Sequence, residues 1–136
     1  MNEAAFDLPE VKFSDQSVTY LETSAGPDAR AAILVERNPI EPQRSLRDVA
    51  SAHVNDARKR LRGYEILEQS ERDLAGVPAI EVRSKWRDDD GMVYTRSVHV
   101  LLGDMHMVIS TEGALESRPV CDATFDQVIE TFRFRA

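Results

Sequence analysis

Residues 79–112, AIEVRSKWRDDDGMVYTRSVHVLLGDMHMVISTE, carry the clearest pattern of secondary structure in this chain. Over Ala79–Arg87, apolar or small side chains alternate with charged ones, and this period of two predicts a β-strand with one buried face. Met92–Leu102 and Met105–Glu112 predict two further strands. Because the three strands follow one another closely along the chain, we expect them to pair as an antiparallel meander.

Tight turns separate these strands. Asp89-Asp90-Gly91 lies between the first two, where Asp-Gly is the expected central pair of a type I′ hairpin turn. Gly103-Asp104 joins the second strand to the third. Upstream, Leu74–Pro78 predicts another turn, and Tyr64–Arg72 before it predicts a fourth strand.

The N-terminal part contributes shorter strands. Phe6–Phe13 predicts an irregular segment with a short strand, and Ser17–Thr23 alternates as a half-buried strand does. Ser24–Asp28 is rich in turn residues. Ala29–Arg37 contains an apolar run on both faces, which is typical of a central strand.

Two helices are expected. Ser45 is a candidate N-cap with Asp48 at the third helical position, a variant of the capping box. One helical stripe follows this cap, formed by Leu46, Val49, Ala50, His53, Val54, Ala57 and Leu61. Gly63 stands where the residue after a helix needs a positive φ. A second helix is predicted over Ala123–Phe132.

One helix after the first strands and one after the meander predict an α+β fold, in which two helices pack on a mainly antiparallel sheet. The chain has 136 residues, which is enough for one domain of ordinary size. No repeat and no change in composition divides residues 1–136, so a single domain is expected.

Composition narrows the class of protein. The 24 acidic residues outnumber the 17 basic ones, and the net charge of -7 disfavours binding to nucleic acid or to anionic lipid. The single cysteine, Cys121, cannot form an internal disulfide, and the first residues show no leader pattern, so a cytoplasmic protein is expected. No apolar run approaches the ~20 residues that span a bilayer, so direct membrane insertion is not expected.

Few residues are able to do metal or thiol chemistry. His53, His99 and His106 lack the short spacings of a metal site, although His99 and His106 can face one another across the predicted hairpin. Cys121 lies near the start of the second predicted helix but has no base nearby in the sequence. Asp88–Gly91 lacks the ligand spacing of a calcium loop. With no phosphate loop or nucleophile elbow either, we expect no enzyme, no metal and no cofactor.

An excess of apolar side chains marks the second face of the predicted sheet. Within Met92–Leu102, Tyr94 and Val98 lie on one face, while Val93 and Leu101 lie on the other. A sheet covered by helices on one side only should be polar on its other side. Two interpretations are open: a sandwich with both faces covered, or an exposed apolar groove for a partner.

A series of short motifs, in the same order along nearly the whole chain, resembles one protein family. The motifs are Phe6–Pro9, Asp15–Tyr20, Gly26-Pro27, Ala32–Val35, the helix Leu46–Leu61 with its exit Gly63-Tyr64, Gly76–Ala79 before the strand that ends in Trp86, and Phe125–Phe134. In their sum they resemble the DcrB-related Eag-type chaperones of type VI secretion effectors.

This resemblance implies a PsbP-like sandwich with a curved sheet, commonly paired as a homodimer. It also implies a partner, the hydrophobic N-terminal transmembrane segment of a secreted effector of the Rhs or PAAR-containing kind. Such a chaperone shields that segment in water and aids its loading on the secretion spike. An apolar helix is then expected to lie in an apolar groove that also offers a few polar groups.

The resemblance also assigns candidate residues to this client-binding groove. They are Val18, Tyr20, Ile33, His53, Ala57, Leu61, Val93 and Ser97. His53 and Ser97 stand where better-known members carry glutamines that hydrogen-bond the client, and both side chains can still donate or accept. Two alternatives are a PsbP-like module that binds a small molecule or lipid, and an immunity protein of a secreted toxin.

Overall fold

The computed structural model describes residues 4–5, 18–24, 30–41 and 44–134. The segment predicted over Phe6–Phe13 lies outside them, as does most of the turn predicted over Ser24–Asp28. Six strands form one sheet in the order β2-β3-β7-β6-β5-β4, and every neighbouring pair is antiparallel. The strands are β2 (Val18–Ser24), β3 (Arg30–Pro39), β4 (Arg62–Leu74), β5 (Val77–Asp88), β6 (Gly91–Leu102) and β7 (Met105–Ala114). The predicted meander is confirmed.

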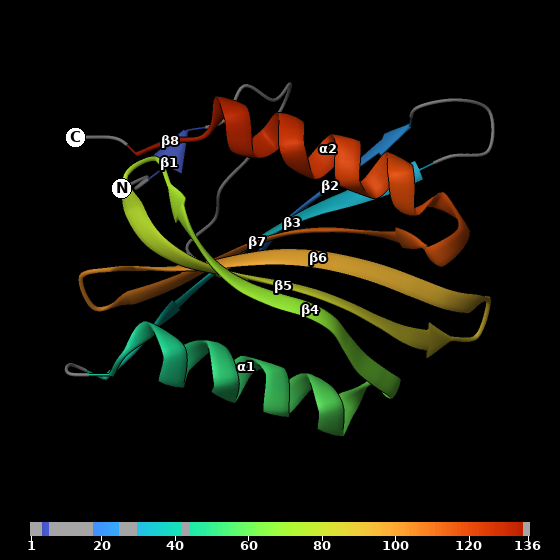
Figure 1. Cartoon of the computed structure of the whole chain (residues 1–136), viewed down its shortest axis with the longest axis horizontal. Coiled ribbons are helices and arrows are strands. Elements are labelled where there is room, and N and C mark those ends of the chain that lie inside the picture. Colours follow the sequence, from blue (N-terminus) through green and yellow to red (C-terminus); the bar gives the residue numbers. More distant parts are fainter. Residues whose placement is uncertain (1–3, 6–17, 25–29, 42–43, 135–136) are drawn as a thin grey trace.

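Two helices lie on opposite faces of this sheet (Figure 1). α1 (Leu46–Arg60) packs over β4, β5 and β6, whereas α2 (Arg118–Thr131), which follows the short helix η1 (Leu115–Ser117), packs over β3, β6 and β7. Two short strands, β1 (Ala4–Ala5) and β8 (Arg133–Phe134), pair with each other. The α+β prediction is confirmed. Neither described helix has the length and apolar character needed to cross a membrane.

The α2 face of the sheet holds the larger apolar core. Phe125 and Phe132 are at most 1% exposed and pack with Val98, Met107 and Ile109 of the sheet. Because each such side chain stabilises the fold by roughly 1.5–3 kcal/mol when it leaves water, this face contributes most of the apolar stabilisation.

The α1 face holds a smaller core. Ala50 and Val54 of α1 pack on Ile80 and Val82 of β5. Among the residues whose side chains the structure describes (31–41 and 44–132), Leu67 is the only large hydrophobic side chain that is exposed, at 36%. The second apolar face is therefore covered by α1 over β4–β6, as the sandwich interpretation expected.

The start of α1 agrees with the prediction, and its end differs from it. The Oγ atom of Ser45 accepts a hydrogen bond from the backbone N–H of Asp48 at 3.0 Å, a cap worth about 1 kcal/mol. Leu61 then ends the helix in an extended conformation, so the prediction that Gly63 directly follows the helix is wrong. Gly63 lies within β4 with φ +63°, where the pairing with β5 shifts register. Glycine adopts this backbone without strain and lets the edge strand bend.

Two other boundaries differ from the sequence-based expectation. α2 begins at Arg118, earlier than predicted, because Pro119 fits the first turn of a helix, where its missing N–H is not needed. The hairpin between β5 and β6 turns at Asp89-Asp90, and Gly91 pairs with Asp88. Asp-Gly is therefore not the central pair of this turn.

Candidate functional site

A cavity of about 280 Å³ lies between α1 and the sheet. The helix contributes residues from its C-terminal half, and all of the strands from β3 to β7 contribute the remainder. The lining residues are Leu34, Glu36, His53, Val54, Ala57, Arg60, Leu61, Tyr64, Val82, Ser84, Trp86, Thr95, Ser97, His99, Ser110 and Glu112.

The cavity combines apolar walls with polar groups on the sheet. The Oγ atoms of Ser97 and Ser110 are 2.8 Å apart, and Trp86 Nε1 donates to Thr95 Oγ1 at 3.2 Å. A pair of serine hydroxyls that share one hydrogen bond keeps one O–H donor and several lone pairs for a third group. The cavity therefore suits an apolar occupant that carries a few polar groups.

Three histidines lie close together, and two of them, His53 and His99, line this cavity. Nδ1 of His99 lies 2.9 Å from Nε2 of His106, and which of them donates depends on the tautomer. The two rings are stacked, and both side chains are buried, so the prediction that they face one another is confirmed. The ring of His53 on α1 lies 5.0 Å from that of His99, and its Nε2 lies 3.2 Å from Oε2 of Glu36 on β3.

Burial keeps the histidine pair neutral. Burial and the neighbouring imidazoles lower the pKa of His99 well below its ordinary value, and lower the pKa of His106 to about 4. The hydrogen bond from His53 lowers the pKa of Glu36, against the opposing effect of burial. One nitrogen of each imidazole hydrogen-bonds to another imidazole or to a carboxylate. Within the described part of the chain, no group of His, Cys, Asp and Glu is arranged to hold a metal ion.

Four of the predicted groove residues line the cavity together. They are His53, Ala57, Leu61 and Ser97. His53 and Ala57 are four residues apart on one stripe of α1, and Leu61 follows as its C-cap. Their part in binding a client stays a prediction.

Three other predicted groove residues, Val18, Tyr20 and Val93, lie near the cavity but are not among the described residues that line it. The backbone of Val18 pairs with Glu36 and that of Tyr20 with Leu34, two residues that line the cavity. The side chains of Val18 and Tyr20 lie outside the described part. Val93 is buried on β6, 7% exposed, and is not among the lining residues.

Ile33 does not lie with the other predicted groove residues. It is 2% exposed and packs with Val35 in the core on the α2 face. Successive side chains of a strand point to opposite faces, so Leu34, and not Ile33, lines the cavity. The run Ala31–Val35 is apolar on both faces, and periodicity alone could not decide between the two positions.

The sequence reasoning missed several lining residues, including Glu36, Trp86 and Ser110. For Ser110 a signal existed. The two-residue turn Gly103-Asp104 fixes the register of β6 and β7, and counting back from it places Ser110 directly opposite Ser97. Glu36 gave a weaker signal, as a carboxylate at the end of an apolar run.

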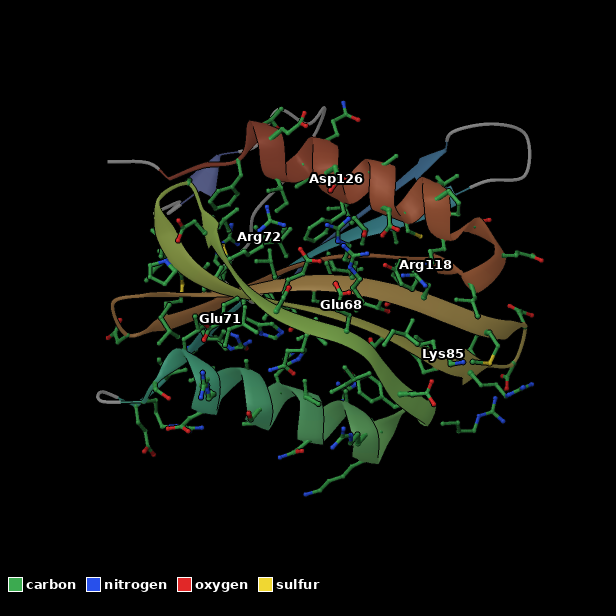
Figure 2. The ribbon with its side chains drawn as sticks, in the orientation of Figure 1. Glu68, Glu71, Arg72, Lys85, Arg118 and Asp126 are labelled. Atoms are coloured by element: carbon green, nitrogen blue, oxygen red, sulfur yellow. The ribbon has the colours of Figure 1, made fainter. Side chains whose placement is uncertain are left out.

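A second cluster, of charged residues, lies beside α2 and joins β4 and β5 to it. Glu81 accepts hydrogen bonds from Arg72, Arg83 and Arg96 at distances of 2.7–3.3 Å. Arg96 also pairs with Asp126 of α2 at 3.1 Å. Figure 2 labels two of the residues that take part, Arg72 on β4 and Asp126 on α2. Because each arginine has a carboxylate partner, the cluster ties elements together and leaves no open anion site.

This architecture defines the class of protein. An antiparallel sheet between two helices is the PsbP-like sandwich, and the structure of CyanoP, the PsbP of the cyanobacterium Synechocystis, has the same fold. The TM-score is 0.61 at 12% sequence identity, over 99% of this chain and 94% of that chain. The PsbP-like prediction for the fold is confirmed.

The sequence matches the DcrB family over residues 3–131. The chain therefore belongs to the DcrB family. A search of curated proteins found no match.

Two further solved structures share the fold. PA94, a protein of unknown function from Pseudomonas aeruginosa, has a TM-score of 0.80 at 15% identity, over 99% of each chain. LpqN of Mycobacterium tuberculosis, which is involved in cell envelope biogenesis, has a TM-score of 0.73 at 11% identity, over 99% of this chain and 86% of that chain. At these identities the similarity shows the fold alone.

Proposed function

We propose that this DcrB-family chain is a cytoplasmic adaptor chaperone for a type VI secretion effector. It binds the hydrophobic N-terminal segment of an effector of the Rhs or PAAR-containing kind, keeps that segment soluble, and aids its loading on the secretion spike. The resemblance of the sequence motifs to the Eag-type chaperones supports this proposal, and it also suggests a homodimer as the working form.

The observation that carries the proposal is the cavity beside α1. It joins apolar side chains such as Val54 and Ala57 to hydroxyls such as Ser97 and Ser110 on the same surface. A transmembrane helix that is held in water needs both an apolar wall and hydrogen-bond partners for its occasional polar groups. A whole helix is about 10 Å wide, so the cavity accepts side chains of the client while the helix itself lies beside α1.

A binding role, not a catalytic one, is part of the proposal. Cys121 is fully buried, and burial raises the pKa of its thiol to about 11, which does not suit a nucleophile. The facing nitrogens of His99 and His106 hydrogen-bond to each other. These features support a carrier whose chemistry is non-covalent.

One observation favours a second candidate function, the binding of a small amphipathic molecule. The volume of about 280 Å³ is close to the lower end of the range for small-molecule sites, roughly 300–1,000 Å³. Native mass spectrometry of the chain purified from its own host distinguishes the two. A stoichiometric small ligand supports the second candidate, and an effector fragment supports the first.

The chaperone proposal is tested by co-expression with the N-terminal fragment of the effector encoded beside it. We expect a stable complex and a higher yield of the fragment. Ala57→Leu fills part of the cavity and should abolish the complex. Ala52→Leu makes the same change on the exposed side of α1 and should preserve it. Absence of a complex with the unchanged chain, or equal loss with both variants, would contradict the proposal.

A further inference from the structure

The apolar contacts of α1 with the sheet do not extend over its whole length. Leu46, Ala50 and Val54 of α1 belong to the apolar cluster with Ile80 and Val82, and an open hollow lies beside Leu46 and Ile80. The C-terminal part of the helix, which carries Ala57, lies over the cavity. Because the apolar cluster ends at Val54, apolar packing fixes the helix less firmly beyond that residue.

One polar contact joins α1 to β3 beside this cavity. Nε2 of His53 lies 3.2 Å from Oε2 of Glu36, and both side chains are about 30% exposed. Two ion pairs of α1 lie elsewhere: Arg47 binds Glu71 on β4 with both side chains 76% exposed, and Arg60 binds Asp56 within the helix. Unlike these two, the hydrogen bond between His53 and Glu36 reaches from α1 across to β3.

The segment that follows α1 allows the change of backbone dihedral angles that opening of the C-terminal half of α1 requires. Leu61 leaves the helix in extended conformation, and Gly63, at φ +63°, lies at a shift of register in β4. A space of more than 4 Å surrounds the position where a Cβ of Gly63 would stand. A glycine at such a point absorbs changes of φ and ψ at low cost.

We infer that the His53–Glu36 contact is a latch that keeps the C-terminal half of α1 closed over the cavity, and that a client helix must break it to enter. The inference rests on the proposed function for the identity of the client. It assigns His53 a regulatory part, where the family resemblance gave it direct contact with the client. The two roles predict opposite effects: loss of a latch strengthens client binding, and loss of a contact weakens it.

The latch is tested first without any client, by hydrogen exchange of the α1 amides in the full chain. Glu36→Gln removes the charge of the contact, and His53→Gln is a second variant should the first fold poorly. We expect amides of the C-terminal half of α1 to exchange about fivefold faster, the effect of losing one charge-assisted hydrogen bond. Glu71→Gln, which removes the exposed ion pair at the other edge of α1, is the control and should leave this half unchanged. Equal exchange in Glu36→Gln and the unchanged chain would overturn the latch.

The second arm measures binding of a defined probe, a lysine-flanked helical peptide of about 20 leucines and alanines. We expect Glu36→Gln to bind it about fivefold more tightly than Glu71→Gln does. Weaker binding by Glu36→Gln would overturn the latch and leave the chaperone proposal intact. Faster α1 exchange with no peptide binding by any form would support the latch and contradict the chaperone proposal.

Discussion

Glu81 is a buried carboxylate in contact with three arginines. It is 4% exposed, and Arg96 approaches both of its oxygens, at 3.0 and 3.3 Å. Burial disfavours its charge, but hydrogen bonds from Arg96, Arg72 and Arg83 outweigh burial and hold the pKa of Glu81 below its ordinary value. Loss of this carboxylate would leave the buried guanidinium of Arg96 without its main partner on β5.

Glu81→Gln should therefore destabilise the fold by about 2 kcal/mol at pH 7. Because the folded pKa of Glu81 is lowered, the stabilisation is complete above the ordinary pKa of 4.5 and is lost as the pH falls through the folded value. Urea unfolding at pH 7 and pH 3 checks both statements, with the exposed Glu71→Gln as a control that should cost less than about 0.5 kcal/mol. A cost for Glu81→Gln that is absent at pH 7, or equal at both pH values, would refute this view of Glu81.

The neutral pair His99–His106 should make stability depend on pH in a different window. Both folded pKa values lie below 6.5, so the unfolded chain binds protons that the folded chain does not, and stability falls as the pH drops from 6.5 toward about 4. The variant His106→Gln lacks one of the two imidazoles that bind these protons. The slope of unfolding free energy against pH should become smaller by up to about 1.4 kcal/mol per pH unit. Denaturant titrations between pH 7 and pH 4.5 measure it, and parallel curves for the two proteins would speak against the neutral pair.

Some side-chain positions in the cavity region could be predicted from the sequence, and others could not. Alternation predicts that Ile33 and Leu34 point to opposite faces, but it does not say which face carries the cavity, because both residues are apolar. The facing of His99 and His106 was predictable from the short turn between them. The approach of His53 to Glu36 was not, since it depends on where α1 crosses the sheet.

The two helices should differ in their share of the stability. Phe125 of α2 is fully buried, and its ring also lies 4.1 Å from the guanidinium of Arg96. Phe125→Ala should cost about 4 kcal/mol, whereas Val54→Ala in the smaller core under α1 should cost about 1–2 kcal/mol. Thermal and urea unfolding of both variants test this order, and an equal cost would show that α1 is held as firmly as α2.

The cavity itself predicts a stabilising substitution. Ala57 is 5% exposed and faces the empty space, so Ala57→Leu adds apolar contacts where few atoms now lie. We expect a gain of about 0.5–1 kcal/mol, measured as a higher unfolding midpoint, with Ala52→Leu near zero as the control. A loss of more than about 1 kcal/mol for Ala57→Leu would mean that the space beneath α1 is already filled.

Element boundaries were predictable where a local signal marks them. Ser45 caps α1 because its hydroxyl reaches the N–H of Asp48, a purely local geometry. The end of α1 was not predictable from Gly63, since pairing of β4 with β5 begins at once and shifts in register there. The long edge strand β4 depends on these non-local partners, which periodicity does not encode.

For the whole molecule, alternation and turn residues were sufficient to predict two helices on an antiparallel sheet. The cavity was only partly predictable, because its lining combines α1 with all of the strands from β3 to β7. Part of the apolar excess on the second sheet face belongs to the core under α1, and part lines the cavity. The net charge of -7 is consistent with a carrier that stays soluble while it holds an apolar segment.

Thiol footprinting of the complex with the effector's N-terminal fragment tests whether this cavity holds the client. Ser110→Cys places a thiol in the half-buried lining, and Leu67→Cys places one on exposed β4, while native Cys121 is fully buried. At saturating fragment, maleimide labelling of Ser110→Cys should slow by about tenfold or more, and labelling of Leu67→Cys should not change. Unchanged labelling of Ser110→Cys in a complex that demonstrably contains the fragment would show that the client binds elsewhere.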